Sequence, residues 1–495
     1  MNAGSIDKIE KAVLLIISLV VFGLVFWLAA LSPGLEGGMD SYNHYLIARF
    51  SWLHPSELLL DQWGKPLYNI LASPFAQFGV KGLVVFNILL LIGSAWMAWL
   101  AARKLQFHHA WLAFVCTLAS PLFFDNVISG LTEPLNAFLL IFIFYLFVGN
   151  RYTLGAIVTG FLPFARSEGY VIMFAIGIYL LVQKEYRTFF LLAVGSVVMN
   201  FVGWMVEGDP IWIYTTNPYI KYQLEVSDGR VNICGSGSLW HYVEHLRWMM
   251  GKTRLVLFIT GSLLVVLGYL RRPTSTTMRA LFFLAFGVYA LYFGVHSIIW
   301  YKGLMGSCGY ERVMVVIDPL AAILMAYALE LFVRYCKGMF PRLWMRVVWL
   351  FIFLTMAWML YAPYSIYGHK YPIDISDEQK LFVKAADWYN EQSYENRMKY
   401  FLYPYLNMLT GIDPKDHEHF TEIWSFDIKY APVGSIVIWD GHFGPNEGKV
   451  PLEQLMSHPD FKLIKSFCPE VPFTTSNNYD FEIYVFERIG DKLLE

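Results

Sequence analysis

Residues 12–31 read AVLLIISLVVFGLVFWLAAL and contain no charged side chain. An apolar run of about 20 residues spans the ~30 Å hydrocarbon core of a bilayer as an α-helix. Similar runs recur along the 495-residue chain, in which 57% of the residues are hydrophobic and only 15% are charged. Soluble domains usually have about 25% charged residues, so this composition excludes a chain of soluble domains. The sequence predicts an α-helical protein that crosses a membrane many times.

Eleven segments are predicted to be transmembrane helices, because each is mostly apolar over a length that suits a membrane span. These segments are residues 12–31, 83–102, 109–125, 131–149, 153–166, 169–183, 187–206, 254–270, 280–299, 313–333 and 346–362. The fifth and sixth are short and meet at residues 166–169, so they also fit one broken helical hairpin. Residues 66–79 are apolar but too short to cross, and they favour a helix that lies in the interface.

The distribution of Lys and Arg predicts how the helices are oriented. If the N-terminus is cytoplasmic, every short internal connection carries at least one basic residue, while the outer loops are longer and richer in acids, aromatics and glycine. An odd number of spans then places the C-terminus outside. Lys8 and Lys11 precede the first span as in a signal peptide, but the length of that span favours an uncleaved anchor. We therefore expect a multi-pass protein of the cell inner (cytoplasmic) membrane.

The chain divides after residue 362 into two predicted domains, because the charged share rises there and no later run reaches spanning length. Residues 1–362 form the transmembrane domain, with a first external loop at 32–82. Residues 363–495 form a small extracytoplasmic α/β domain. Asp440 and His442 follow a predicted strand of this domain, and we interpret them as polar loop residues in preference to a functional site. The domain is expected to contain a helix and four strand-like runs: 377–391, then 398–403, 434–439, 461–467 and 481–487.

Charge and cysteine content narrow the classes of function. The 37 basic and 39 acidic residues give a net charge of −2, so there is no basic excess to bind nucleic acid. Cys234 and Cys308 both lie in predicted outer loops, where a disulfide and two free thiols both fit. His241 and His245 would share a helix face, but no HExxH motif and no third ligand accompany them. The sequence requires no cofactor, and a divalent metal stays compatible with it.

Polar residues gather on the predicted outer side, and ionisable groups at membrane depth usually serve function. Asp40 lies in GGMDSYNHY (37–45), just beyond the first span. It could act in catalysis or simply cap the following helix. Lys65 precedes Pro66 and the interfacial helix. It could bind an anionic headgroup or extend into water as an ordinary snorkelling lysine.

Further polar residues lie on the same side. Glu133 opens the fourth span after Thr132, which could alternatively cap that helix. Arg166 and Glu168 fall between two apolar segments. They could neutralise each other, although an arginine fork also matches phosphate oxygens. Two later outer loops add a histidine, a tyrosine and an arginine: His245, Tyr310 and Arg312.

Taken in order, these motifs resemble the GT-C superfamily of integral-membrane glycosyltransferases, which take sugars from polyprenyl-phosphate donors. The similar features are Asp40 in the first outer loop, Lys-Pro at 65–66, Thr-Glu-Pro-Leu at 132–135, Arg-x-Glu-Gly at 166–169 and ERVMVVIDP at 311–319. The chain looks like the mannosyltransferase and aminoarabinose transferase types. It departs from some members in having one acid at 40 and not an acidic pair, and it has no WWDYG-like oligosaccharyltransferase signature.

The resemblance implies a GT-C-like fold and inverting transfer of a sugar from polyprenyl phosphate to a hydroxyl of a glycan, lipid or protein acceptor on the outer face. It implies Asp40 as the base and Glu133 and Glu168 as supporting residues. The implied ligands of the donor phosphate are Arg312, Lys65, Arg166, Tyr310 and His245. The alternatives are a flippase or transporter of lipid-linked sugars, a polysaccharide polymerase or ligase, and a structural protein. A transporter is expected to show repeat symmetry and charges near the midplane, whereas here the charges gather on one side.

Overall fold

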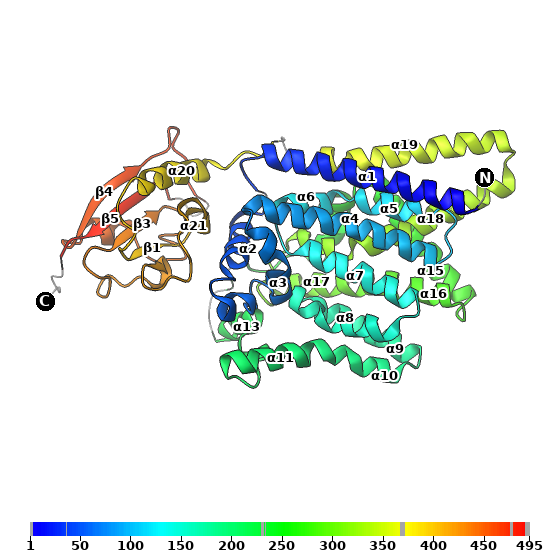
Figure 1. Cartoon of the computed structure of the whole chain (residues 1–495), viewed down its shortest axis with the longest axis horizontal. Coiled ribbons are helices and arrows are strands. Elements are labelled where there is room, and N and C mark those ends of the chain that lie inside the picture. The colour runs from blue at the N-terminus through cyan, green and yellow to red at the C-terminus, as the bar shows by residue number, and fades with distance from the viewer. Residues whose placement is uncertain are drawn as a thin grey trace.

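The computed structural model describes residues 3–35, 37–228, 232, 234–366, 372–475 and 479–490. It consists of a bundle of long helices with a smaller domain at one end (Figure 1). The end of the bundle that meets this domain is called the domain end below. The opposite end, where the first helix begins, is called the far end.

The helices of the bundle lie at the predicted spans, with the exception of the third span. They are α1 (Ala3–Leu31), α4 (Val80–Lys104), α5 (Trp111–Leu118), α6 (Pro121–Ser129), α7 (Glu133–Val148), α8 (Tyr152–Ala165), α9 (Gly169–Val182), α10 (Tyr186–Phe190), η2 (Leu191–Ala193), α11 (Val194–Glu207), α15 (Lys252–Arg271), α16 (Thr276–Arg279), η3 (Ala280–Gly287), α17 (Val288–Lys302), η4 (Glu311–Ile317), α18 (Asp318–Met339) and α19 (Arg342–Ile366). Among the described residues, seven helices are long and apolar enough to cross a membrane, or eight with one bent pair, and three shorter apolar helices accompany them. The polytopic helical fold is confirmed, while the number of eleven spans stays a prediction.

The third predicted span, residues 109–125, is not one straight helix. Its two pieces, α5 and α6, meet at an angle of 57°. The Ser120 hydroxyl caps α6 by accepting a hydrogen bond from the Phe123 amide at 3.1 Å, and Pro121 occupies the first helical position. Both features favour a helix start. The prediction of an unbroken span is wrong here, because hydropathy does not register a capped helix start inside an apolar run.

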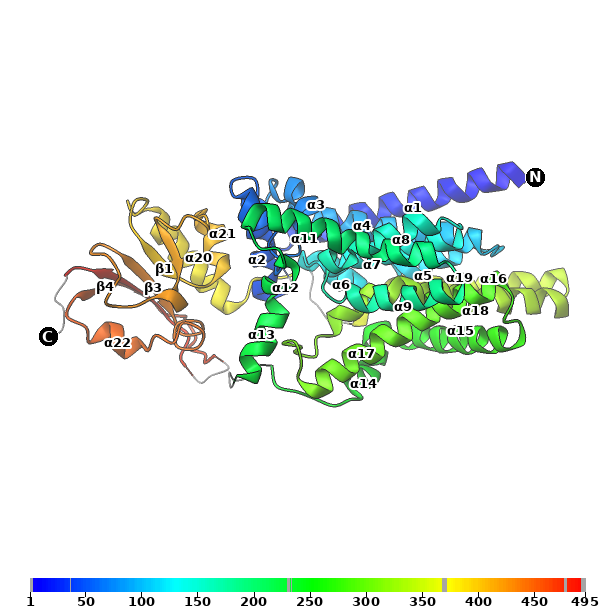
Figure 2. The ribbon, with the colours of Figure 1, turned by 90° about the horizontal axis from the view of Figure 1, so that it is seen from below.

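Short helices cover the domain end of the bundle (Figure 2). The helix expected within residues 66–79 is present as α3, and its position in the interface stays a prediction. Of the helices between α11 and α15, only the one that carries His241 and His245 was expected from the sequence. The short helices are α2 (Gly38–Phe50), η1 (Pro55–Leu59), α3 (Pro66–Ala76), α12 (Trp212–Thr215), α13 (Pro218–Ser227) and α14 (His241–Met250).

The C-terminal domain is built on a five-stranded sheet with the order β2-β1-β3-β5-β4. The neighbours of β1 run parallel to it, and the neighbours of β5 run antiparallel to it. The expected helix and all four strand-like runs are present, and β2 is a further strand that was not predicted. The elements are α20 (Asp377–Asn390), β1 (Lys399–Phe401), α21 (Pro404–Thr410), β2 (Phe420–Glu422), η5 (Ile423–Ser425), β3 (Ile436–Asp440), α22 (Leu452–Met456), β4 (Phe461–Phe467) and β5 (Ile483–Arg488).

The C-terminal domain packs directly on the first loop of the bundle. Tyr42 of α2 belongs to the apolar core of this domain, and its hydroxyl accepts a hydrogen bond from the Gln379 amide at 3.0 Å. A second contact joins His54 to Asp413 at 2.7 Å. The domain therefore holds α2, the helix that carries Asp40.

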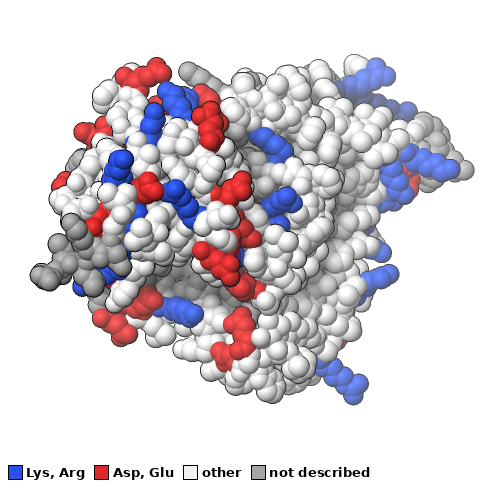
Figure 3. All heavy atoms as spheres, turned by 60° about the vertical axis from the view of Figure 1, so that its left-hand side comes forward, with Lys and Arg blue, Asp and Glu red and all other residues white. Residues whose placement is uncertain are grey.

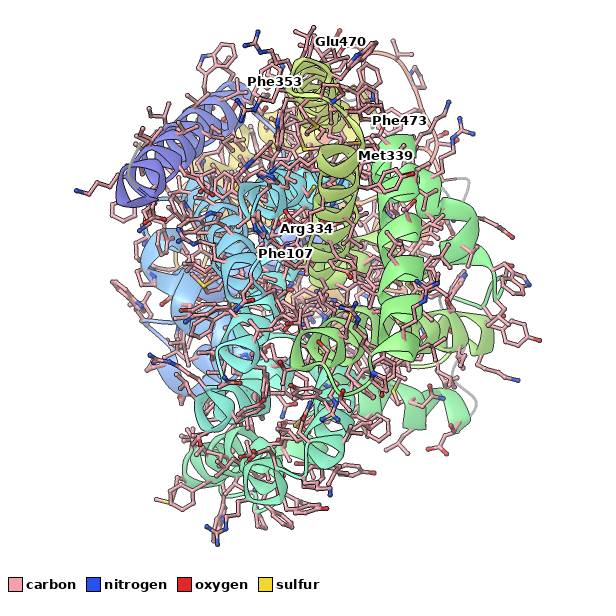
Figure 4. All side chains as sticks on the ribbon, turned by 90° about the vertical axis from the view of Figure 1, so that its right-hand side faces the viewer. Phe107, Arg334, Met339, Phe353, Glu470 and Phe473 are labelled. Carbon is pink, nitrogen blue, oxygen red and sulfur yellow. A yellow bond between two sulfur atoms is a disulfide. The ribbon has the colours of Figure 1, made fainter. Side chains whose placement is uncertain are left out.

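Charged side chains lie mainly at the two ends of the molecule (Figure 3). Acidic and basic residues mix over the C-terminal domain and the domain end, basic residues predominate at the far end, and a largely uncharged belt separates them. At the far end, Phe107 and Arg334 lie near the centre of the view in Figure 4. Arg334 Nε donates to Glu330 Oε1 at 2.7 Å, and this glutamate is 1% exposed.

Candidate active site

The helix α2 begins after a tight turn at Gly37, where φ is 95°. A side chain at this position would approach Leu131 to 3.1 Å, so both the backbone angle and the lack of space favour glycine. Asp40 lies in the first turn of α2, but the helix has no side-chain cap. Because Asp40 and His44 are one turn apart on a helix, they share a face. Both residues line the same cavity.

Lys65 lies immediately before α3 with a φ of 71°, which residues other than glycine rarely adopt. Its ammonium donates hydrogen bonds to the carbonyl oxygens of Trp63 at 2.8 Å and Gln62 at 3.2 Å. It also donates to the Tyr219 hydroxyl at 2.9 Å. Only 3% of Lys65 is exposed. The side chain is therefore held within the protein and does not extend into water as a snorkelling lysine would.

Arg166 occupies the break between α8 and α9, as the sequence predicted. Its Nη1 lies 2.8 Å from Glu133 Oε1, and its Nη2 lies 2.7 Å from Glu168 Oε1. Nη1 also donates to the Thr132 hydroxyl at 2.9 Å, while α7 receives no side-chain cap from this threonine. The break in the helical pair thus brings a cation to the carboxylate that opens the neighbouring helix α7.

Arg312 lies at the start of η4 and contacts two carboxylates. Its guanidinium forms a short ion pair with Asp40, and its Nε lies 3.5 Å from Glu133 Oε1. The Tyr310 ring centroid lies 4.6 Å from the guanidinium carbon, a favourable cation–π distance. Since Glu133 contacts both arginines, five residues from four parts of the chain form one connected series of ion pairs. This ion-pair chain consists of Asp40, Arg312, Glu133, Arg166 and Glu168.

A cavity of about 540 Å³ lies against the ion-pair chain. All five members of the chain line it, and so do Lys65 and Tyr310. The rest of its wall includes apolar side chains, among them Leu131, Val171, Ile299 and Val313. A cavity whose wall combines cations with apolar side chains fits an amphipathic anionic ligand.

Bonding capacity remains unused in the ion-pair chain. Glu133 Oε2, Glu168 Oε2 and Arg166 Nε have no hydrogen-bond partner among the described residues. Each buried polar atom left in this state costs about 1–3 kcal/mol. A ligand that forms hydrogen bonds with these atoms would recover part of this cost. The site therefore favours binding of a polar or charged group.

His44 is buried beside the cations and stacks on Trp63, with ring centroids 4.7 Å apart. Burial, and then the positive charges of Lys65, Arg166 and Arg312, hold the pKa of His44 well below its usual value. The ring is therefore neutral near pH 7. A neutral imidazole can donate or accept one proton in hydrogen bonds with a bound ligand, and its Nδ1 has no such partner among the described residues.

A disulfide joins Cys234 to Cys308, which decides between the alternatives that the sequence left open. Cys308 lines the cavity in the segment between α17 and η4. The bond ties this segment to the loop that precedes α14. It therefore restrains the part of the chain that leads to Tyr310 and Arg312.

His245, which the resemblance implied as a phosphate ligand, is not among the residues that line the cavity. Its Nε2 and the Nε2 of His241 each lie 3.9 Å from Glu311 Oε1. Among the described residues, these three form a group whose ligand atoms are close enough to hold a metal ion. Inside the cavity, Asp40 and Glu133 are engaged by arginines. A divalent cation at this position would have to compete with the arginines for the carboxylate oxygens.

Three further residues that sequence reasoning missed line the cavity: His44, Asn217 and Tyr219. The position of His44 carried a usable signal, because it lies one helical turn after Asp40. Asn217 and Tyr219 come from the start of α13, in a loop without any recognisable motif, so their position depends on the tertiary fold.

No protein-family profile matches the sequence, and no curated protein sequence shows significant similarity to it. Among solved structures, ArnT from Cupriavidus metallidurans bound to undecaprenyl phosphate is similar over 99% of both chains, with a TM-score of 0.62 and 11% identity. Apo ArnT gives a TM-score of 0.56 over 98% of both chains at 12% identity. The archaeal oligosaccharyltransferase AglB from Archaeoglobus fulgidus, in complex with an inhibitory peptide and a dolichol-phosphate, gives 0.51 over 81% of this chain and 64% of that chain at 11% identity. Similarity at these identities concerns the fold, and it confirms that the chain has the ArnT-like fold expected from the motifs.

Proposed function

We propose that this chain, whose fold is that of the GT-C glycosyltransferases, transfers a sugar from a polyprenyl-phosphate donor to an acceptor hydroxyl. The observation that carries the proposal is one cavity in which a partly exposed carboxylate, Asp40, lies with Lys65 and Arg312. The similar folds support the donor class, because ArnT was solved with undecaprenyl phosphate and AglB with a dolichol-phosphate. The proposal covers both hexosyl and pentosyl transfer.

In the proposed reaction the acceptor oxygen attacks the anomeric carbon, and the bond from that carbon to the phosphate oxygen breaks. Polyprenyl phosphate leaves, and the configuration at the anomeric carbon inverts through an oxocarbenium-like state. Asp40 is the base that takes the acceptor proton. Its side chain is 36% exposed, whereas that of Glu133 is 1% exposed and contacts both arginines.

The ion pair of Arg312 with Asp40 links donor binding to activation of the base. While this ion pair is formed, the guanidinium occupies a carboxylate oxygen that would otherwise be available to the acceptor hydroxyl. The donor phosphate competes for the same guanidinium fork. When Arg312 turns to the phosphate, Asp40 is released to accept the acceptor proton, while Glu133 continues to hold the arginine.

Cations placed around the leaving phosphate stabilise the negative charge that develops on it. Arg312, Arg166 and Lys65 have this role in the proposal, and Tyr310 supports the Arg312 guanidinium through its ring. Glu133 and Glu168 keep the arginines in position. His245 is left out of this set because it does not line the cavity.

The polyprenyl chain would follow the apolar part of the cavity wall into the membrane. Each buried methylene of a lipid chain contributes about 0.8 kcal/mol, so a long chain adds substantial affinity. We place the domain end on the extracytoplasmic side of the cytoplasmic membrane, with the N-terminus in the cytoplasm. Two observations support this orientation: the Cys234–Cys308 disulfide, which suits an oxidising compartment, and the basic far end seen in Figure 3.

The test is incubation of the purified, reconstituted protein with radiolabelled polyprenyl-phosphate sugars and a panel of glycan, lipid and protein acceptors. The label is expected to move to one acceptor with the wild type and to stay on the donor with Asp40→Asn. Movement of the labelled lipid across a vesicle membrane, without formation of a new glycosidic bond, would identify a flippase and contradict the proposal.

A further inference from the structure

A second cavity, of about 590 Å³, lies where α14 meets α15, against the domain-end part of α19. It has no lining residue in common with the candidate active site. Its wall carries three cations, Arg247, Lys252 and Arg254, and two tryptophans, Trp248 and Trp358. Neither the sequence motifs nor the proposed transfer reaction uses any of these residues.

Arg254 is the unusual member of this wall, because it is an arginine that is only 1% exposed. Its Nη2 donates to Asp318 Oδ2 at 2.8 Å and to the Cys116 carbonyl oxygen at 3.3 Å. Its Nε and Nη1 have no partner among the described residues. Asp318 therefore balances the charge of Arg254 but uses only part of its hydrogen-bonding capacity. Buried guanidinium N–H groups without acceptors are costly, and these belong to a residue in the wall of a cavity.

A helix N-terminus reaches the same cavity. The 20-residue helix α15 starts at Lys252, and its N-cap is Gly251, which offers no side-chain acceptor. The first amides of such a helix have no partner within the helix, and the helix dipole adds positive potential at this end. Gly251, Lys252 and Thr253 all line the cavity. The first residues of α15 and Arg254 thus belong to the same cavity wall, and a helix N-terminus beside an arginine favours a phosphate.

The mouth of the cavity is also cationic. Arg247 and Lys252 are both exposed, and no ion pair within the described ranges involves either of them. The wall contains one acidic residue, Glu244. With Asp318 balancing Arg254, the remaining two cations and one acid leave the cavity positively charged.

The surroundings of the cavity indicate a lipid and not a free anion. Trp248 is 46% exposed and Trp358 is 57% exposed, and exposed tryptophans are typical of the membrane–water interface. Below them, α15 and α19 carry exposed apolar side chains such as Val256, Leu263 and Leu354. These would contact the chains of a lipid whose headgroup occupies the cavity.

We propose that this cavity binds the phosphate headgroup of an anionic membrane lipid, separately from the polyprenyl-phosphate donor. Arg254 and the first amides of α15 hold the phosphate, Arg247 and Lys252 attract it, and the lipid chains lie against α15 and α19. This proposal does not depend on the transfer reaction, since it concerns different residues and requires only binding.

The test is native mass spectrometry of the delipidated full-length protein, titrated with palmitoyl-oleoyl phosphatidylglycerol, with the matching phosphatidylcholine, and with inorganic phosphate. The variant Arg247→Gln/Lys252→Gln changes exposed side chains and leaves the buried pair intact. The control Lys462→Gln/Lys465→Gln removes the same charge from the C-terminal domain, where both lysines are exposed. A basic residue near an anionic lipid strengthens binding about fivefold, so we expect the first variant to bind phosphatidylglycerol roughly 10- to 30-fold more weakly than the control does.

A second variant addresses Arg254 itself. Removal of this arginine alone would leave Asp318 buried and unpaired, so Arg254→Gln is combined with Asp318→Asn. This pair is expected to lose phosphatidylglycerol binding while its thermal unfolding stays close to that of the wild type. Equal phosphatidylglycerol binding by both variants and the control would overturn the proposal. Binding of inorganic phosphate with the same affinity as the lipid would also overturn it, because it would identify a site for a free anion.

Discussion

Glu133 at the domain end and Glu330 at the far end are both 1% exposed, and each contacts arginine. Both oxygens of Glu330 have partners: Oε1 accepts from Arg334 and the His108 amide, and Oε2 accepts from the His109 amide. Glu133 leaves Oε2 without a partner among the described residues and lines a cavity. Burial and ion pairing are common to both sites. The two glutamates differ in their hydrogen bonds: a carboxylate oxygen without a partner lies beside a cavity at Glu133 and not at Glu330. This unpartnered oxygen, and not the buried charge, distinguishes the candidate active site.

The two glutamates also differ in what they connect. Glu330 ties the loop after α4 to α18 through short, satisfied bonds, so its contribution is to stability. Glu133 belongs to a series of alternating charges that continues through Arg312 to a partly exposed acid. Variants at the two ends should therefore separate activity from stability.

The largest effect is expected for Asp40→Asn. Loss of the base should reduce the rate of sugar transfer by roughly 10²- to 10⁴-fold, the usual contribution of general base catalysis. The amide can still accept a hydrogen bond from Arg312, so the fold should be retained. The measurement is transfer of labelled sugar together with thermal unfolding. Wild-type turnover by this variant would remove Asp40 from the mechanism.

The second prediction compares the effect on transfer of replacing Arg312 and of replacing Arg334, because each arginine contacts a buried glutamate. Arg312→Ala should lower transfer by about 10²- to 10³-fold, as does loss of one group that stabilises charge in a transition state. Arg312→Lys should recover only part of it, because the planar fork is lost. Arg334→Ala, the matched control at the far end, should leave transfer unchanged. Similar losses in Arg312→Ala and Arg334→Ala would show that the comparison between the two ends is mistaken.

A third, smaller effect concerns stability at the far end. Glu330→Ala removes the acceptor of the part-buried amides of His108 and His109, and each lost hydrogen bond costs about 1 kcal/mol. Arg334 is half exposed, so its loss of a partner adds little. We expect a lower unfolding temperature and unchanged transfer per folded molecule. A variant with normal unfolding and reduced transfer would assign this network a role in the reaction.

The smallest effect concerns a third buried carboxylate, Asp440 in the C-terminal domain. Burial raises its pKa from 3.8 to about 6. In the unfolded chain the Asp440 carboxyl loses its proton at a lower pH than in the folded protein. The protonated carboxyl therefore contributes stability that is fully present below about pH 4 and is lost as the pH rises through about 6. The pKa of His442 is also raised, by its hydrogen bond to Glu378, and it acts with the same sign at higher pH.

Asp440→Asn isolates this contribution. Asp440 Oδ1 accepts from the amides of His442 at 3.0 Å and Phe443 at 2.7 Å, and the Asn oxygen can accept both. The variant should lose less stability than the wild type between pH 4 and 6, by an amount that corresponds to a few degrees in unfolding temperature. Hydrogen exchange of strand β3 in the full-length protein measures the difference. Parallel pH profiles for the two proteins would contradict the assignment.

Sequence reasoning recovers what depends on local pattern. Apolar runs located the bundle helices, and the break at Arg166 and Glu168 was found because charged residues interrupt such a run. Four of the five strands in the C-terminal domain followed from alternation and turn residues. By contrast, the 57° bend between α5 and α6 depends on a cap and a proline within an apolar segment, which hydropathy averages out.

The candidate site was predictable as a set of residues but not as a set of contacts. Arg312 and Asp40 are 272 positions apart, so their pairing depends on how α2 and η4 pack in the bundle. The same limit explains why His245 was placed with the phosphate ligands although it contacts Glu311. His44 was missed because a histidine within an aromatic segment is usually part of the core, and only its neighbours reveal its proximity to the cations.

The measurement that tests the central claim most directly is a cryo-electron microscopy map of the protein in nanodiscs with undecaprenyl phosphate. Our account predicts phosphate density within hydrogen-bond distance of Arg312 and Lys65, with Arg312 moved away from Asp40. Phosphate density elsewhere, with the pair of Arg312 and Asp40 intact, would contradict the account.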